Sequence, residues 1–152
     1  MSALQAMLSP EKLALLRSAY AEEPNWLAEN AVKTLTATYP GAAGMVGALH
    51  ERFFLPNALT LDVVTRELCL VFHFAGGPRD VPVALHIYWA LMLGATAESV
   101  AETLLLAGAY RGIECYYAGL RVLERTLGDL GKLTTHRPAD CFVALANNTR
   151  PA

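Results

Sequence analysis

One histidine stands out as a candidate for chemistry. His86 lies in residues 83–89, where every other side chain is aliphatic or aromatic. A buried imidazole requires a hydrogen-bond partner, because an unpaired polar group is costly in apolar surroundings. It is then either a hydrogen-bonded residue of the core or a general acid and base, since imidazole changes charge near neutral pH. Taken alone, the pattern favours the core residue, and the sequence leaves both interpretations open.

Two charged residues could act together with His86. Glu67 lies in a mostly apolar segment, where a carboxylate is seldom buried unless it is paired. It would either orient the imidazole or share its proton, as a carboxylate does beside a catalytic histidine. Otherwise it lies on a solvated face or forms a salt bridge with Arg66 or Arg111. Arg79 precedes His86 by seven residues, about 10 Å along one stripe of a helix. It could hold a substrate carboxylate through two hydrogen bonds, or it is a surface arginine at a helix start.

Other reactive side chains have less support. Cys69 and His73 share one helix face, but thiolate formation needs an accessible, positive setting, so the apolar sequence around them favours two core residues. Trp89 and Tyr110 line either the core or a ligand pocket. The three cysteines are widely spaced and form no CxxC pair, so we expect no disulfide framework, no metal site and no cofactor. They are Cys69, Cys115 and Cys141.

The composition indicates one soluble domain with surplus apolar surface. Of the 152 residues, 54% are hydrophobic and only 17% are charged, with a mean hydropathy of +0.31. A domain of this size cannot easily bury so much apolar surface, which predicts a homo-oligomer; a very apolar monomer is the alternative. A net charge of −2 without a basic stripe makes nucleic acid an unfavourable partner.

The sequence also predicts a cytoplasmic location. It has no cationic start followed by an apolar run and a cleavage site, the pattern of a secretory signal. Its longest uncharged apolar stretch, residues 81–97, contains a proline and a histidine and is short for a membrane span. Unpaired cysteines fit a reducing compartment. We therefore expect no membrane partner.

Helix-start and helix-stop residues predict an all-α, single-domain bundle of six to seven helices. Ser9, Thr60 and Thr96 are candidate caps, Gly76, Gly94 and Gly112 are candidate ends, and no alternating pattern predicts a strand. The tail from residue 128 to 152 is predicted to lack long regular structure, and it either belongs to the same domain or packs on a neighbouring subunit. The expected helices cover residues 10–22, 24–38, 42–54, 60–75, 78–94, 96–112 and 113–127.

An ordered set of short motifs resembles the carboxymuconolactone decarboxylase family, whose superfamily includes the alkylhydroperoxidase D-like proteins. The similarity covers residues 42–127, with N-terminal helices in residues 1–41 and the tail in 128–152. It implies an alkylhydroperoxidase D-like helical fold that assembles as a trimer or hexamer. The motifs are Thr65-Arg66-Glu67-Leu68, Ala84-Leu85-His86, Gly94-Ala95-Thr96, Val100-Ala101-Glu102-Thr103-Leu104-Leu105 and Ala109-Tyr110-Arg111-Gly112.

The redox branch of this superfamily carries C-x-x-C-x-x-x-H with a glutamate one helix earlier. Here Glu67 and His86 match the glutamate and the histidine, whereas Arg79 and Pro82 occupy the cysteine positions. Peroxide reduction by a dithiol requires both thiols, so the chain resembles the non-redox branch.

The resemblance to the non-redox branch implies a cofactor-free lyase or isomerase acting on a small carboxylated lactone or organic acid. His86 would transfer the proton and Glu67 would set its tautomer, with Arg79, Tyr110 and Trp89 in contact with the substrate. The alternative is a non-catalytic binding or accessory protein on the same scaffold.

Overall fold

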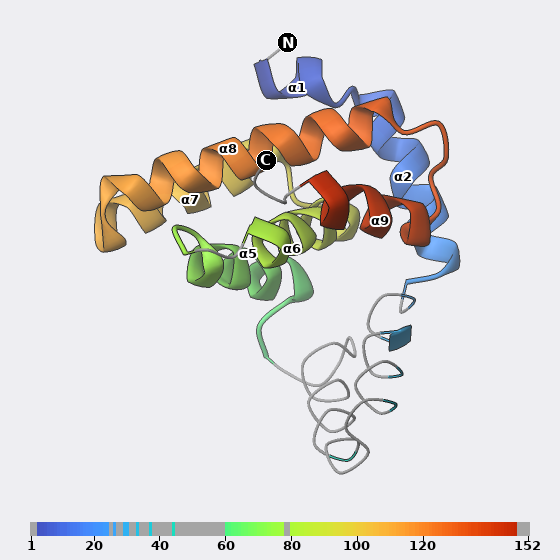
Figure 1. The fold of residues 1–152 in the computed structure, drawn as a ribbon, viewed down its shortest axis with the longest axis horizontal. Helices are drawn as coiled ribbons and strands as arrows, with labels where there is room; N and C mark the ends of the chain where they lie inside the picture. Colours follow the sequence, from blue (N-terminus) through green and yellow to red (C-terminus); the bar gives the residue numbers. More distant parts are fainter. Residues whose placement is uncertain are drawn as a thin grey trace.

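The computed structural model describes residues 3–24, 60–77 and 80–148, together with positions 26, 29, 30, 33, 37 and 44. This part of the chain contains seven α-helices and no strand, which confirms the predicted all-α bundle (Figure 1). The helices expected at 24–38 and 42–54 fall almost entirely outside it. The observed helices are α1 (Ala3–Met7), α2 (Pro10–Glu22), α5 (Val63–Phe74), α6 (Asp80–Leu93), α7 (Ala97–Arg111), α8 (Ile113–Lys132) and α9 (Pro138–Asn148).

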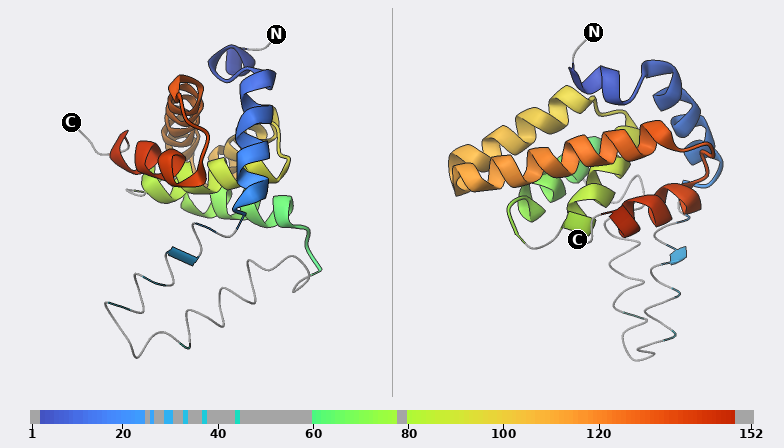
Figure 2. Two further views of the ribbon diagram at one scale, coloured as in Figure 1. Left: turned by 90° about the vertical axis from the view of Figure 1, so that its right-hand side faces the viewer. Right: turned by 45° about the horizontal axis from the view of Figure 1, so that its top comes forward.

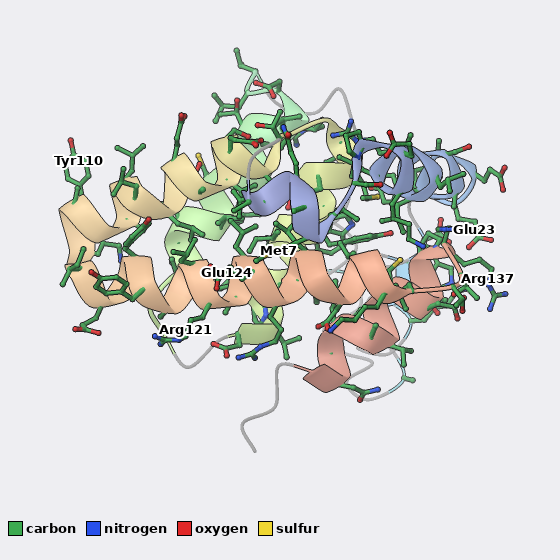
Figure 3. The ribbon with its side chains drawn as sticks, turned by 90° about the horizontal axis from the view of Figure 1, so that it is seen from above. Met7, Glu23, Tyr110, Arg121, Glu124 and Arg137 are labelled. Carbon is green, nitrogen blue, oxygen red and sulfur yellow. The ribbon has the colours of Figure 1, made fainter. Side chains whose placement is uncertain are left out.

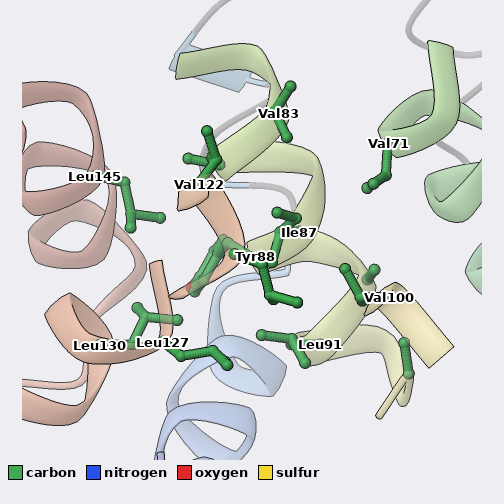
Figure 4. Close-up of a cluster of buried hydrophobic side chains, with 14 of the residues drawn as sticks. Val71, Val83, Ile87, Tyr88, Leu91, Val100, Val122, Leu127, Leu130 and Leu145 are labelled. Atoms are coloured by element: carbon green, nitrogen blue, oxygen red, sulfur yellow. The ribbon is translucent and has the colours of Figure 1, made fainter. Parts of the chain in front are cut away.

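Helix α6 is the centre of the bundle. It packs against α5, α8, α2 and α9, while α7 and α8 form a long antiparallel hairpin (Figures 1 and 2). The side chains of α6 point into the main cluster of buried apolar residues (Figure 4). This explains why its sequence is apolar on all sides. The hairpin is close-packed, since a Cβ added to Gly119 would lie 2.4 Å from a methyl carbon of Leu104.

Side-chain caps fix three helix starts, two of them at predicted residues. The Ser9 hydroxyl accepts a hydrogen bond from the Lys12 amide, and Thr96 forms a reciprocal capping box with Ser99. The prediction that Thr60 caps the fourth helix is wrong. Asp62 caps α5 instead, because its carboxylate accepts bonds from both the amide and the hydroxyl of Thr65, at 2.9 and 2.6 Å.

The predicted tail without long regular structure is also wrong. Helix α8 continues to Lys132, and α9 follows as an eleven-residue helix. Burial explains both differences, since Leu130 on α8 and Cys141 and Leu145 on α9 are enclosed in the core. The gain from burying such side chains, about 1.5–3 kcal/mol for a leucine, exceeds the cost of about 1 kcal/mol for a glycine within a helix. Within the described residues, no helix has the length and apolar character needed to cross a bilayer.

Candidate functional site

The structure joins Glu67 and His86. Nδ1 of His86 lies 2.8 Å from Oε2 of Glu67, and the two side chains are only 12% and 7% exposed. An ionised carboxylate can only accept hydrogen bonds, so the proton of this bond is on Nδ1. The pair is therefore a nearly enclosed, oriented imidazole–carboxylate unit.

Two helices supply the pair and its surroundings. Glu67 and Phe74 are seven residues apart, so they share the face of α5 that packs on α6. The Phe74 ring stacks on the imidazole of His86, with a centroid distance of 5.3 Å and an interplanar angle of 8°. Trp89, one turn after His86 on α6, meets the imidazole at 5.3 Å with a tilt of 44°. These contacts fix the plane of the ring as well as its tautomer.

The second ring nitrogen is the reactive atom that this geometry leaves available. With Nδ1 occupied by Glu67, Nε2 of His86 has no hydrogen-bond partner among the described residues. A neutral imidazole in this tautomer has its lone pair on Nε2, and the protonated ring has a transferable proton there. An imidazole oriented by a carboxylate at one nitrogen can accept and return one proton at the other, as in hydrolytic triads.

A third titratable side chain near the pair was missed by the sequence analysis. Burial, followed by the negative charge of Glu67, raises the pKa of Tyr20 from 10.0 to about 12. The Tyr20 ring meets Tyr88 edge-on, with centroids 6.1 Å apart. Nothing in the local sequence distinguishes Tyr20 from an ordinary apolar-face residue of α2, and its proximity to Glu67 arises only from the packing of α2.

The remaining predicted site residues are placed differently. Arg79 lies outside the described residues. Trp89 contacts His86, whereas Tyr110 lies in the last turn of α7 and is 82% exposed, so its side chain encloses no part of the pair in this chain (Figure 3). Arg111, an alternative partner for Glu67, instead donates to the carbonyls of Phe72 and His73 at the end of α5.

The expectation that Cys69 and His73 are core residues is wrong. Both are exposed, because α5 buries only the face that carries Glu67 and Val71. Cys69 lines a shallow apolar groove between α5 and α7, which we call the α5–α7 groove. The three cysteines are free thiols on three different helices. The groove is lined by Thr65, Leu68, Cys69, Phe72, Thr103 and Leu106.

Comparison of the chain with protein-family models, with curated proteins and with solved structures finds no match. The resemblance drawn from the motifs therefore stays a prediction. No group of three or more histidine, cysteine, aspartate or glutamate side chains that could hold a metal ion occurs within the part of the chain that the structure describes.

Proposed function

We propose that this protein is a cofactor-independent, carboxymuconolactone decarboxylase-like enzyme that transfers a proton to or from a small carboxylated lactone or organic acid. The observation that supports this function is the hydrogen bond of 2.8 Å between Glu67 and His86. It orients the imidazole, sets its tautomer and leaves Nε2 for the substrate.

In the proposed reaction, the bond between a substrate carbon and its carboxylate breaks and CO2 leaves. The electron pair stays on that carbon, where a neighbouring carbonyl delocalises it. The imidazolium of His86 then donates its Nε2 proton to the carbon, and a proton from water restores the imidazolium. Glu67 stabilises the charged ring throughout. Trp89 provides an apolar wall beside the ring, and we assign the anchoring of the substrate carboxylate to Arg79.

The test is a turnover assay on a panel of carboxylated lactones and β-keto acids. Turnover is measured as CO2 release and as deuterium incorporation in D2O. Replacing His86 by Gln should lower turnover by about 100-fold or more, the usual contribution of a general acid or base. His73→Gln is the matched control, because His73 is exposed and its ring contacts Phe74 rather than Glu67. Full turnover by a folded His86→Gln variant would refute the catalytic role.

A second candidate function is a non-catalytic binding or accessory protein. The observation that favours it is enclosure, since the His86 side chain is only 12% exposed and is stacked on Phe74. In that case the pair acts in folding alone. Glu67→Gln and His86→Gln would then lower stability, and no acid in the panel would release CO2 or exchange a proton with the unmodified protein.

A dithiol peroxidase is not proposed, because Arg79 and Pro82 stand where the two thiols would be needed. If the protein nevertheless reduced peroxides, and alkylation of its cysteines abolished that activity, this conclusion would be wrong.

Its three free thiols fit a reducing compartment, and we propose a cytoplasmic location for the protein.

We further propose that the protein forms a homo-oligomer, a trimer or hexamer, through the α5–α7 groove. The groove is apolar, and Leu106, which lines it, is 54% exposed. Tyr110 lies one turn further along α7, on the same face as Leu106. Aromatic and aliphatic side chains without charges are typical of the centre of a subunit interface. A second copy of the chain is the partner that also accounts for the apolar surplus in the composition.

A further inference from the structure

Lys12 of α2 binds the segment that connects α8 to α9. Its Nζ atom donates a hydrogen bond to the carbonyl of Leu133, the residue directly after α8, and lies 2.8 Å from Nε2 of His136. The side chains of Lys12 and His136 are both half-buried. The connecting segment, residues 133–137, passes beside α2 (Figures 1 and 2). We call this contact the Lys12–His136 latch, because it holds the start of α9 beside α2.

The latch requires a neutral histidine. The ammonium group of a lysine has three donors and no acceptor, so Nε2 of His136 accepts this hydrogen bond. A protonated imidazole carries a hydrogen on each ring nitrogen and can accept none. Protonation of His136 therefore breaks the contact and places a second positive charge beside that of Lys12. Imidazole is the side chain that ordinarily gains a proton in mildly acidic solution.

The charged side chains that adjoin His136 in the connection and in α9 are paired with one another. Arg137 donates from Nε to Oδ2 of Asp140 at 3.1 Å, and this bond holds the pKa of Asp140 below its ordinary value. The carboxylate of Glu23, just after α2, also acts on Arg137. The thiol of Cys141 contacts the backbone carbonyl of His136 at 3.9 Å and is uncharged, because burial raises its pKa.

The adjoining parts of α2 and α8 carry charges of both signs. On α2, Glu11 is exposed and accepts hydrogen bonds at the start of its own helix, which lowers its pKa. On α8, the last turn contains Asp129 and Lys132. Within the described residues, no carboxylate forms a hydrogen bond with the His136 ring. Lys12 is the charged group in direct contact with the imidazole, so its charge dominates there.

Opening of the latch would free the first turn of α9, which encloses Cys141. The Cys141 side chain has no exposed surface, and Leu145, one turn further, is 1% exposed. Helix α9 is the last helix of the described residues and packs on α6 and α8. Segments near the end of a chain are among those that open locally without global unfolding. Exposure of the Cys141 thiol therefore reports directly on the opening of α9.

We propose that the Lys12–His136 latch is a pH-sensitive switch, in which protonation of His136 releases α9 and opens the core at Cys141 in mildly acidic solution. The open form binds one more proton than the closed form. Acid therefore shifts the equilibrium toward the open form, by at most about tenfold per pH unit. The switch is separate from the Glu67–His86 pair, so it can be tested independently of the proposed function.

The first test measures the rate at which 4,4′-dithiodipyridine labels Cys141, with peptide mass spectrometry to separate it from the other two thiols. Labelling in the unmodified chain should accelerate by about 10-fold between about pH 7.5 and 5.5. His136→Gln should show no such acceleration, because the amide oxygen accepts the Lys12 bond and does not titrate. His73→Gln is the matched control and should behave as the unmodified chain, since His73 is exposed on α5. No acceleration in the unmodified chain, or equal acceleration in His136→Gln, would overturn the inference.

A second variant opens the latch from the other side. Lys12→Met keeps the apolar stem but removes the ammonium group, so Cys141 should be labelled rapidly at about pH 7.5 already, with little further increase in acid. Slow labelling of folded Lys12→Met at that pH would contradict the switch.

A third measurement uses the unmodified chain alone and so serves if neither variant folds. Hydrogen exchange, corrected for the intrinsic effect of pH, should show that the α9 amides lose protection by about 10-fold between about pH 7.5 and 5.5, while the α7 amides keep theirs. Unchanged protection of α9, or equal loss in both helices, would refute a local opening at this latch.

Discussion

Nδ1 of His86 and Oε2 of Glu67, from the facing helices α6 and α5, lie 2.8 Å apart in a setting that is almost closed to solvent. Removing two such groups from water is expensive, and their attraction offsets that cost only when the geometry is good. A fold maintained for stability alone could place two apolar side chains here at no loss. The cost of the pair therefore supports the proposed proton transfer at Nε2, because stability alone does not require these two groups.

The two residues should be energetically coupled. We expect Glu67→Ala to lower the free energy of unfolding by about 3 kcal/mol, because it leaves a buried imidazole without its partner. His86→Ala should cost a similar amount. The double variant should cost less than the sum of the two by about 1–3 kcal/mol, measured by urea denaturation. Additive effects would show that the hydrogen bond contributes nothing.

The site was predictable to the extent that it follows helix periodicity and paired chemistry. Glu67 and His86 are the polar residues whose buried placement demands a partner, and each meets that demand through the other. Thr96 was predictable as a cap because its hydroxyl directly precedes a helical segment. In each case one local rule and the tertiary structure favour the same outcome.

The structure differs from the sequence-based predictions where contacts between distant segments determine which residues are buried. The local pattern of α5 is apolar nearly all round, yet only one face meets α6, so Cys69 and His73 are exposed. Helix α9 forms because Leu145 is buried in the core. The sequence of α9 alone does not predict this burial. Tyr20 comes within the electrostatic reach of Glu67 only because α2 packs on α6. Such contacts join residues that are far apart in sequence. The hydrophobic periodicity within one segment does not predict them.

Charge in the α5–α7 groove should prevent self-association. Leu106→Glu places a carboxylate in the groove and should shift the protein to monomers, because a buried unpaired charge is costly. Leu105→Glu is the matched control, since both leucines are 54% exposed and Leu105 does not line the groove. Sedimentation velocity would measure both. A monomeric unmodified protein, or equal effects of the two variants, would contradict the proposed interface.

Gly76 should tolerate no side chain. Its φ of +77° disfavours other residues, and an added Cβ would lie 2.2 Å from Sγ of Cys115. We expect Gly76→Ala to lower the free energy of unfolding by about 2–4 kcal/mol through backbone strain and overpacking. Gly128→Ala is the control, because a Cβ there meets no atom within 4 Å and α8 gains helix propensity. A stable Gly76→Ala variant would show that the turn after α5 can move away from Cys115 of α8 without cost.

Stability should fall in alkali through the buried phenols and one thiol. Burial and Glu67 raise the pKa of Tyr20 from 10.0 to about 12, and burial also raises the pKa of Tyr88 and of Cys141. The unfolded chain loses these protons first, so for Tyr20 the stabilisation is complete below pH 10 and is lost as the pH rises toward 12.

Tyr20→Phe removes one ionising group and should make the fall in unfolding free energy over this range shallower. Glu67→Gln should act in the same direction, because the charge opposing ionisation is gone. Urea denaturation at several pH values measures the slope, and identical slopes in all three proteins would show that Tyr20 ionises as freely in the folded state as in the unfolded chain.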